Sequence, residues 1–195
     1  MFIGRERELK IIENRIHSNR FEFGILYGRR RIGKTTLLKN ISQNHHALYF
    51  VCNSMGLEYN LNQLSQTIAL FFDEPITFEN FESVFSYLSK KSLNNKLTFI
   101  LDEFTYLMES NSNILSVMQN SIDLYFVNSN VCFIISGSHV GMVEEAISYK
   151  KPLYGRSTFK IKLEAFNYLE ASQFYPNLNS KEKIELYSIF GGVAF

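Results

Sequence analysis

The chain has 195 residues, of which 46% are hydrophobic and 20% are charged, and its formal net charge is +1 at pH 7. This length suits one domain with a sizeable core and leaves little room for two. The balanced charge gives little support to a general nucleic-acid binder, and no apolar run approaches the roughly 20 residues of a membrane span. The charged N-terminus and the two isolated cysteines, Cys52 and Cys132, lead us to expect a cytoplasmic protein with reduced thiols.

Apolar runs and amphipathic segments alternate along the chain. In chain order the pattern predicts a helix over residues 5–19, a strand over 21–27, a helix over 34–44, a strand over 47–51, helices over 60–72 and 78–91, a strand over 97–101, a helix over 113–127, a strand over 131–136, a weak helix over 139–149, a strand over 158–163 and helices over 168–175 and 180–190. Strands separated by helices of ten or more residues pair in parallel through right-handed crossovers. Helices then cover both faces of the sheet, which explains why the strands are continuous apolar runs. We therefore expect an α/β fold in three layers, as one domain over residues 1–195.

A phosphate-binding loop follows the first predicted strand. Its eight residues fit G-x-x-x-x-G-K-[ST] without a mismatch: Gly28, Arg29, Arg30, Arg31, Ile32, Gly33, Lys34 and Thr35. A strand before the motif and a helix after it are the context in which backbone N–H groups and a helix N-terminus cradle phosphates. Lys34 would reach the β- and γ-phosphates, and the hydroxyl of Thr35 would ligate Mg²⁺. The alternative is a glycine-punctuated surface loop with a chance lysine.

The strand at residues 97–101 ends in two adjacent carboxylates, Asp102 and Glu103, which is the form of a Walker B motif. Ligands of open parallel sheets bind at the carboxyl ends of the strands, so Asp102 is expected beside the phosphates as a Mg²⁺ tether. Glu103 would orient an attacking water as the catalytic base. The alternative is an acidic turn after the strand. Because the sequence has no guanine-reading motif, we expect ATP as the nucleotide.

Two further segments supply candidate catalytic residues. Ser138 follows the fourth strand and would contact the γ-phosphate or the attacking water, although it could equally cap the next helix. Arg156 precedes the fifth strand, and a guanidinium directed at the γ-phosphate would stabilise the charge that develops there, from the same subunit or from a neighbour. The alternative for Arg156 is a surface arginine after a turn. With Glu103 in place, His139 is not expected to act as a base.

Together these segments resemble the archaeal-type ATPase family, a branch of the STAND and AAA+-related P-loop NTPases. The resemblance rests on segments at residues 2–9, 27–37, 101–104, 135–142, 152–156 and 190–193, which follow one another in the family's order. It implies a sheet with strand order 5-1-4-3-2 and ATP between the N-terminal segment and the phosphate loop. Phe2, Ile3 and Gly4 would then lie near adenine, and Thr36 would join the nucleotide-binding residues.

The chain departs from the family pattern in two ways. Ala194 stands where relatives typically have proline after the Gly-Gly-Val segment. Relatives also continue into a helical lid and a C-terminal domain, and we expect residues 1–195 to hold the ATPase core without them.

Several functions are compatible with these motifs. The first is hydrolysis of Mg·ATP to ADP and phosphate. The alternative is a STAND-type nucleotide-dependent signalling switch with little turnover, acting through a homo-oligomer or an unknown protein partner. A nucleic-acid-dependent motor has weak support because the sequence shows no basic stripe. A kinase would need an acceptor-site motif, which the sequence does not show, and no membrane association is expected.

Overall fold

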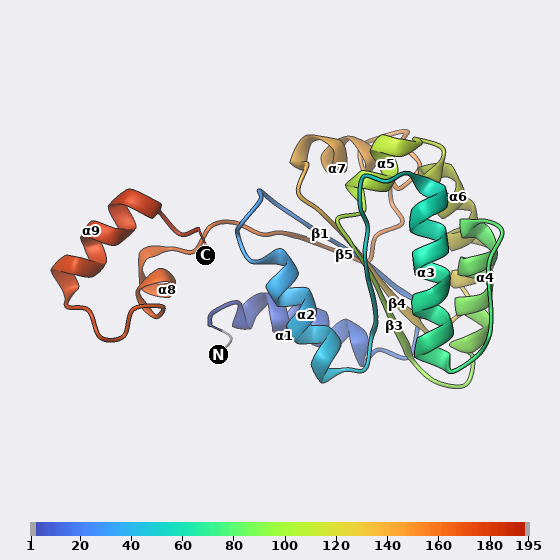
Figure 1. Cartoon of the computed structure of the whole chain (residues 1–195), viewed down its shortest axis with the longest axis horizontal. Helices are drawn as coiled ribbons and strands as arrows, with labels where there is room; N and C mark the ends of the chain where they lie inside the picture. Colours follow the sequence, from blue (N-terminus) through green and yellow to red (C-terminus); the bar gives the residue numbers. More distant parts are fainter. Residues whose placement is uncertain (1–2, 194–195) are drawn as a thin grey trace.

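A computed structural model describes residues 3–193, and its centre is a five-stranded parallel sheet (Figure 1). The strands are β1 (Glu22–Tyr27), β2 (Leu48–Val51), β3 (Leu97–Asp102), β4 (Val131–Gly137) and β5 (Phe159–Lys162). They lie in the order β2-β3-β4-β1-β5, and every neighbouring pair is parallel. The predicted order is therefore confirmed. Since all five strands run the same way, the ends of β1, β3 and β4 meet at one edge of the sheet.

Helices cover both faces of this sheet (Figure 1). One face packs against α1 (Glu6–Ile16) and α2 (Lys34–Asn44). The other packs against α3 (Leu57–Phe72), α4 (Phe81–Lys91), α5 (Thr105–Ser110), α6 (Ile114–Ser121), the π-helical turn η1 (Ile122–Phe126) and α7 (Val140–Ala146). Alternation along β1 shows how one strand serves both cores: Phe23 and Ile25 face α3–α7, whereas Leu26 faces α1 and α2. The predicted three layers are confirmed.

The structure differs from the predicted elements at a few places. The helix predicted over residues 113–127 is divided, because its last turn widens into η1. The short helix α5 follows β3 directly and was not predicted, since its six residues are too few for a periodic pattern. Helix α4 begins at Phe81, three residues later than predicted, because the side chain of Asn80 accepts the N–H of Ser83 and caps the helix.

Two further helices, α8 (Tyr168–Ser172) and α9 (Ser180–Phe190), project away from the sheet (Figure 1). No residue of either helix is buried. We call residues 166–193 the α8–α9 lobe. None of the helices formed by residues 3–193 is long and apolar enough to cross a bilayer.

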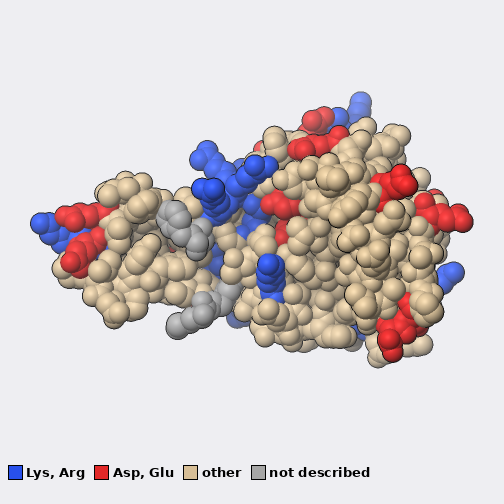
Figure 2. Space-filling view, viewed as in Figure 1, with Lys and Arg blue, Asp and Glu red and all other residues tan. Residues whose placement is uncertain are grey.

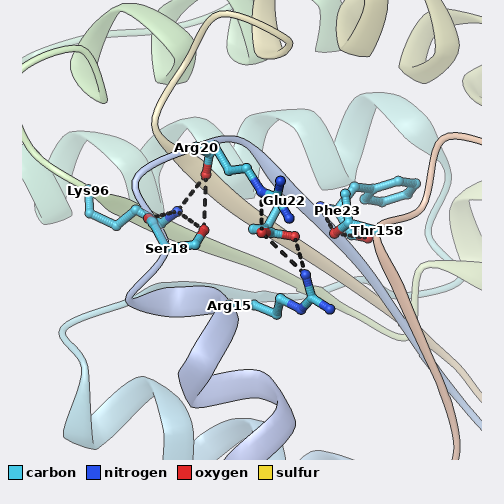
Figure 3. Close-up of polar contacts among 7 residues, drawn as sticks. All are labelled: Arg15, Ser18, Arg20, Glu22, Phe23, Lys96 and Thr158. Atoms are coloured by element: carbon cyan, nitrogen blue, oxygen red, sulfur yellow. Dashed lines mark hydrogen bonds and ion pairs between the residues drawn. The ribbon is translucent and has the colours of Figure 1, made fainter.

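At the opposite edge of the sheet from the ends of β1, β3 and β4, a buried carboxylate holds α1 against β1 (Figure 3). Glu22 accepts hydrogen bonds from Arg15, at 3.3 and 3.4 Å, and from Arg20, at 3.0 Å. Burial alone would raise the pKa of Glu22, but hydrogen bonding with Thr158 and the two guanidinium groups together hold that pKa below its ordinary value. Lys96 donates to the backbone carbonyls of Ser18 and Arg20, so the turn before β1 is fixed as well.

Candidate functional site

The predicted phosphate loop joins β1 to α2 at the carboxyl edge of the sheet. Gly28 begins it with φ 153°, and a Cβ there would lie 2.2 Å from the carbonyl oxygen of Leu163, so no other residue fits. Ile32 is buried and anchors the middle of the loop in the core beneath α1 and α2. The side chains of Arg29, Arg30 and Arg31 are exposed. The loop therefore presents its backbone at the N-terminus of α2, where anions are stabilised.

Lys34, the first residue of α2, is buried and folds back over the loop. Its ammonium group donates to the carbonyl oxygens of Gly28, at 2.8 Å, and Arg29, at 2.7 Å. Burial lowers the pKa of Lys34, while the charges of Glu103 and Asp102 oppose that shift. A cation thus lies at the loop, close enough to two carboxylates to interact with them.

Asp102 ends β3 and is completely buried. Its Oδ2 accepts hydrogen bonds from the hydroxyl of Thr35, at 2.9 Å, and from the phenol of Tyr49, at 2.7 Å. Its Oδ1 accepts from the hydroxyl of Ser136 and from the backbone N–H of Glu103. Four donors from four segments therefore fix the carboxylate, and the two residues predicted to hold Mg²⁺, Thr35 and Asp102, are in direct contact.

The donor set at Thr35 and Asp102 fits a magnesium ion. Mg²⁺ prefers oxygen ligands and is usually held by one or two carboxylates together with substrate phosphates and water. A hydroxyl and a carboxylate in contact at 2.9 Å, beside a loop that suits phosphate, provide those groups. Among residues 3–193 no group of three or more His, Cys, Asp or Glu side chains forms a separate metal centre.

Glu103 follows Asp102 with φ 53°, a left-handed conformation that is uncommon outside glycine. Its backbone N–H bonds both Asp102 and the hydroxyl of Ser136, which holds this conformation in place. The hydroxyl of Ser138 donates to Oε2 of Glu103 at 2.6 Å. The structure thus brings the predicted base and the predicted serine into direct contact, at the ends of β3 and β4.

A cavity of about 540 Å³ lies beside the loop. It is lined by Gly28, Arg29, Arg30, Ile32, Val140, Lys162, Leu163, Glu164, Ala165 and Val193. Figure 2 shows Lys and Arg side chains gathered where the sheet core meets the α8–α9 lobe. A positively charged recess at the phosphate loop suits an anionic ligand.

The N-terminal segment predicted to lie near adenine is joined to the phosphate loop by a hydrogen bond from Arg5 to the carbonyl oxygen of Ile32. Gly4 is buried with its Cα against the ring of Phe166, and Ile3 is half-buried. Phe2 and Ala194 lie outside the described residues. Thr36 has an exposed side chain on α2. The adenine-binding roles of Phe2, Ile3 and Gly4 and the nucleotide contact of Thr36 stay predictions.

The structure does not bring Arg156 to this site, and its predicted contact with the γ-phosphate, from this subunit or from a neighbour, stays a prediction. Thr158, two residues later, exchanges hydrogen bonds with the backbone of Phe23 near the start of β1 (Figure 3). Five residues of strand, about 16 Å, separate Phe23 from Gly28. The guanidinium of Arg156 is also engaged locally, by both carboxylate oxygens of Asp123, at 2.9 and 2.7 Å.

Sequence reasoning missed the role of two residues that hold Asp102. Tyr49 lies inside an apolar strand, where its hydroxyl gives no sign of a polar partner. Ser136 stands two residues before Ser138 in the sequence, but its bond to Asp102 depends on the pairing of β3 with β4.

Comparisons with known proteins identify the family of this chain. A family model for ATPase domains found predominantly in Archaea matches residues 2–194. The chain is 34% identical, over 199 residues, to the uncharacterized protein MJECL04 of Methanocaldococcus jannaschii, covering all of this chain and 43% of that protein. Over 44 residues it is 46% identical to the uncharacterized ATP-binding protein MJ0423 of the same organism, covering 23% of this chain and 75% of that protein. The chain thus spans less than half the length of MJECL04.

Solved structures share the fold. The Walker-type ATPase PABY2304 of Pyrococcus abyssi superposes with a TM-score of 0.75 at 19% identity, over 98% of this chain and 64% of that one. The ORC2 protein of Aeropyrum pernix, in its ADPNP–ADP complexes, gives a TM-score of 0.60 at 20% identity, over 93% of this chain and 50% of that one. The loop, the buried Asp102 and the match over residues 2–194 lead to one conclusion: the chain belongs to the family of ATPase domains found predominantly in Archaea.

Proposed function

We propose that this domain binds Mg·ATP and hydrolyses it to ADP and phosphate. The observation that carries the proposal is the hydrogen bond between Thr35 and Asp102, because it joins the phosphate loop to the Walker B-type carboxylate at the end of β3. The presence of ADPNP and ADP in the ORC2 structure, which has the same fold, supports the choice of an adenine nucleotide.

Each residue of the site has a chemical task in this proposal. The backbone of the loop and the N-terminus of α2 bind the phosphates, and Lys34 exchanges its carbonyl partners for phosphate oxygens. Thr35 and Asp102 would hold Mg²⁺, which supplies charge neutralisation at the phosphates. Glu103 accepts a hydrogen bond from the attacking water and orients it. Positioning and electrostatic stabilisation provide most of the acceleration.

The contact between Ser138 and Glu103 favours a second function, a nucleotide-dependent switch with little turnover. The hydroxyl of Ser138 donates a charge-assisted hydrogen bond to Oε2 of Glu103, with 2.6 Å between the two oxygens, and this bond competes with one from water. Hydrolysis would then be slow until Ser138 releases Glu103. In that case the protein would retain nucleotide and respond to it by changing partners.

Calorimetry and phosphate release with the same protein test the proposal. Wild-type protein is expected to bind Mg·ATP and to release phosphate slowly. Lys34→Ala should abolish binding, whereas Lys39→Ala, an exposed lysine on the same helix, should not. Glu103→Gln should keep binding but lose turnover, whereas the exposed Glu58→Gln should change neither.

The outcomes separate the two functions. Binding with turnover that Glu103→Gln removes supports hydrolysis. Tight binding without turnover, accompanied by a nucleotide-dependent change in mass by light scattering, supports the switch. No heat on titration of Mg·ATP into folded protein would refute both.

Arg156 enters the proposed mechanism only from a neighbouring copy of the chain. Its bidentate pair with Asp123 holds it far from its own phosphate loop. In a homo-oligomer that places Arg156 of one subunit beside the phosphate loop of the next, its guanidinium would exchange Asp123 for the phosphates bound to that neighbouring subunit.

A further inference from the structure

Arg5 is the one arginine that the structure buries, among the arginines of residues 3–193, with only 5% of its surface exposed. It lies at the start of α1, immediately after Gly4, and has a left-handed backbone with φ 69°. The carboxylate of Glu8 lies 3.7 Å from its guanidinium. Its Nε has no hydrogen-bond partner. A buried donor without a partner carries a desolvation cost, which the other contacts of the guanidinium must offset.

The guanidinium joins two segments that are far apart in sequence. Its Nη2 donates to the carbonyl oxygen of Ile32, in the phosphate loop, at 3.0 Å. The same nitrogen donates to the carbonyl oxygen of Glu164, in the segment after β5, at 2.6 Å. Hydrogen bonds from a charged donor are the stronger kind, so a displacement of the loop backbone at Ile32 also displaces the backbone at Glu164.

The flat face of Arg5 also meets the base of the α8–α9 lobe. Its Cζ lies 3.9 Å from the centroid of the Phe166 ring, well inside the range of a cation–π contact. Gly4 also lies against this ring, since a Cβ there would lie 2.9 Å from a Phe166 ring carbon. Phe166 is therefore held between the N-terminal segment and the lobe.

Phe166 in turn holds the lobe together. Its N–H donates to the carbonyl oxygen of Gly192 at 2.8 Å, and its carbonyl accepts from the phenol of Tyr187 at 3.2 Å. Its ring lies 5.3 Å from that of Phe174. The lobe has no buried residue in either helix, so this cluster at its base determines its position relative to the core.

We propose that Arg5 is a positioning residue that couples occupancy of the phosphate loop to the position of the α8–α9 lobe. The inference rests on the proposed nucleotide binding. Phosphate bound to the loop restricts the motion of the backbone at Ile32. The guanidinium of Arg5 is then fixed as well, because it bonds the carbonyls of Ile32 and Glu164 while it lies on the ring of Phe166. Phe166 is then held in its stacked position, and the lobe opens less often.

Lysine cannot replace arginine in this role. Its ammonium is a compact charge without a planar face, so it can bond a carbonyl but cannot bridge two carbonyls while lying flat on Phe166. Arg5→Lys therefore keeps the charge and removes the connection. Arg7→Lys is the matched control, because Arg7 is exposed on the same helix.

Hydrogen–deuterium exchange of the full chain, with and without Mg·ADP, tests the coupling. In wild-type protein and in Arg7→Lys, Mg·ADP is expected to slow exchange about fivefold or more across residues 166–193, the lower end of typical coupling between two sites. In Arg5→Lys the protection of residues 28–35 should remain while that of residues 166–193 disappears. Since coupling is reciprocal, the affinity for Mg·ADP should fall by the same factor.

A purely stabilising Arg5 would change exchange equally with and without nucleotide, and that result would overturn the inference. Full nucleotide-dependent protection of the lobe in Arg5→Lys, or no response of the lobe in wild-type protein that binds Mg·ADP, would also overturn it. Wild-type protein that binds no Mg·ADP would refute the proposed function itself. If Arg5→Lys does not fold, Phe166→Leu removes the same contact from the other side, and retained coupling in that variant would reject the proposal.

Discussion

Removal of a single hydroxyl, in Tyr49→Phe, tests whether Asp102 is held in position by the residues around it. The phenol donates to Oδ2 of Asp102 at 2.7 Å, on the same oxygen that Thr35 bonds. Burial and the neighbouring Asp102 both raise the pKa of Tyr49, so the hydroxyl stays protonated and remains a donor at neutral pH. Phenylalanine keeps the ring and its packing and deletes only this bond.

The expected cost follows from the kind of bond that is lost. A hydrogen bond to a charged group contributes about 1.5–3 kcal/mol, and Asp102 would keep three of its four donors. The free energy of unfolding, from urea or guanidinium titration, should fall within that range. Tyr59→Phe is the control: Tyr59 has an exposed side chain, so its free energy of unfolding should change by less than about 0.5 kcal/mol.

The same variant has a predicted effect on magnesium. If the loss of this hydrogen bond weakens the binding of Mg·ATP at Asp102 by about 1.4 kcal/mol, the affinity for ATP in the presence of Mg²⁺ should fall about tenfold. The affinity for ATP in EDTA should not change, because the phosphate loop is untouched. Calorimetry under both conditions gives the ratio. An unchanged ratio, or tighter binding of ATP with Mg²⁺, would show that Tyr49 does not position the carboxylate.

Three further changes probe other parts of the structure. Gly24→Ala should destabilise the core by about 1–3 kcal/mol, because its Cβ would lie 2.1 Å from a ring carbon of Phe159; a denaturant midpoint equal to that of wild type would contradict this packing. Because the pKa of Glu22 is lowered in the folded state, its carboxylate stabilises the fold at pH values above its ordinary pKa of 4.5, and this contribution is lost as the pH falls through the folded pKa. In urea titrations the free energy of unfolding should therefore fall less steeply with decreasing pH in Glu22→Gln than in wild type. Parallel curves would exclude this contribution of Glu22. Arg156→Ala should lower phosphate release only if copies assemble, and mixing it with Lys34→Ala should then restore part of the activity; no recovery in mixtures of proven oligomers would argue against action between subunits.

Much of the site was predictable because its residues follow one another along the chain. The phosphate loop is a continuous motif, and Asp102 could be placed beside it because the ends of parallel strands share one edge. The helices and strands were found because their apolar spacing is long and regular. Short segments such as α5, and the widening of the last turn before residue 127, carry no such pattern.

The contacts that depend on tertiary register were not predictable. Tyr49 lies opposite Ile100 in the pairing of β2 with β3, and only this register lets its phenol reach Asp102. The partner of Arg156 was not predictable, because its neighbours in sequence show that a strand follows but not that its guanidinium pairs with Asp123. Arg5 belonged to a recognised segment, yet its partners come from residues 32, 164 and 166.

Leu163 is the last residue of the hydrophobic core between the sheet and the helices α1 and α2, and neither α8 nor α9 adds a buried side chain to it. Substitutions at exposed positions of α8 and α9 therefore leave the packing of the strands unchanged. Over evolutionary time such a peripheral appendage can diversify in sequence, length and angle while the chemistry at the loop persists. Different descendants of one nucleotide-binding core could in this way acquire distinct outputs.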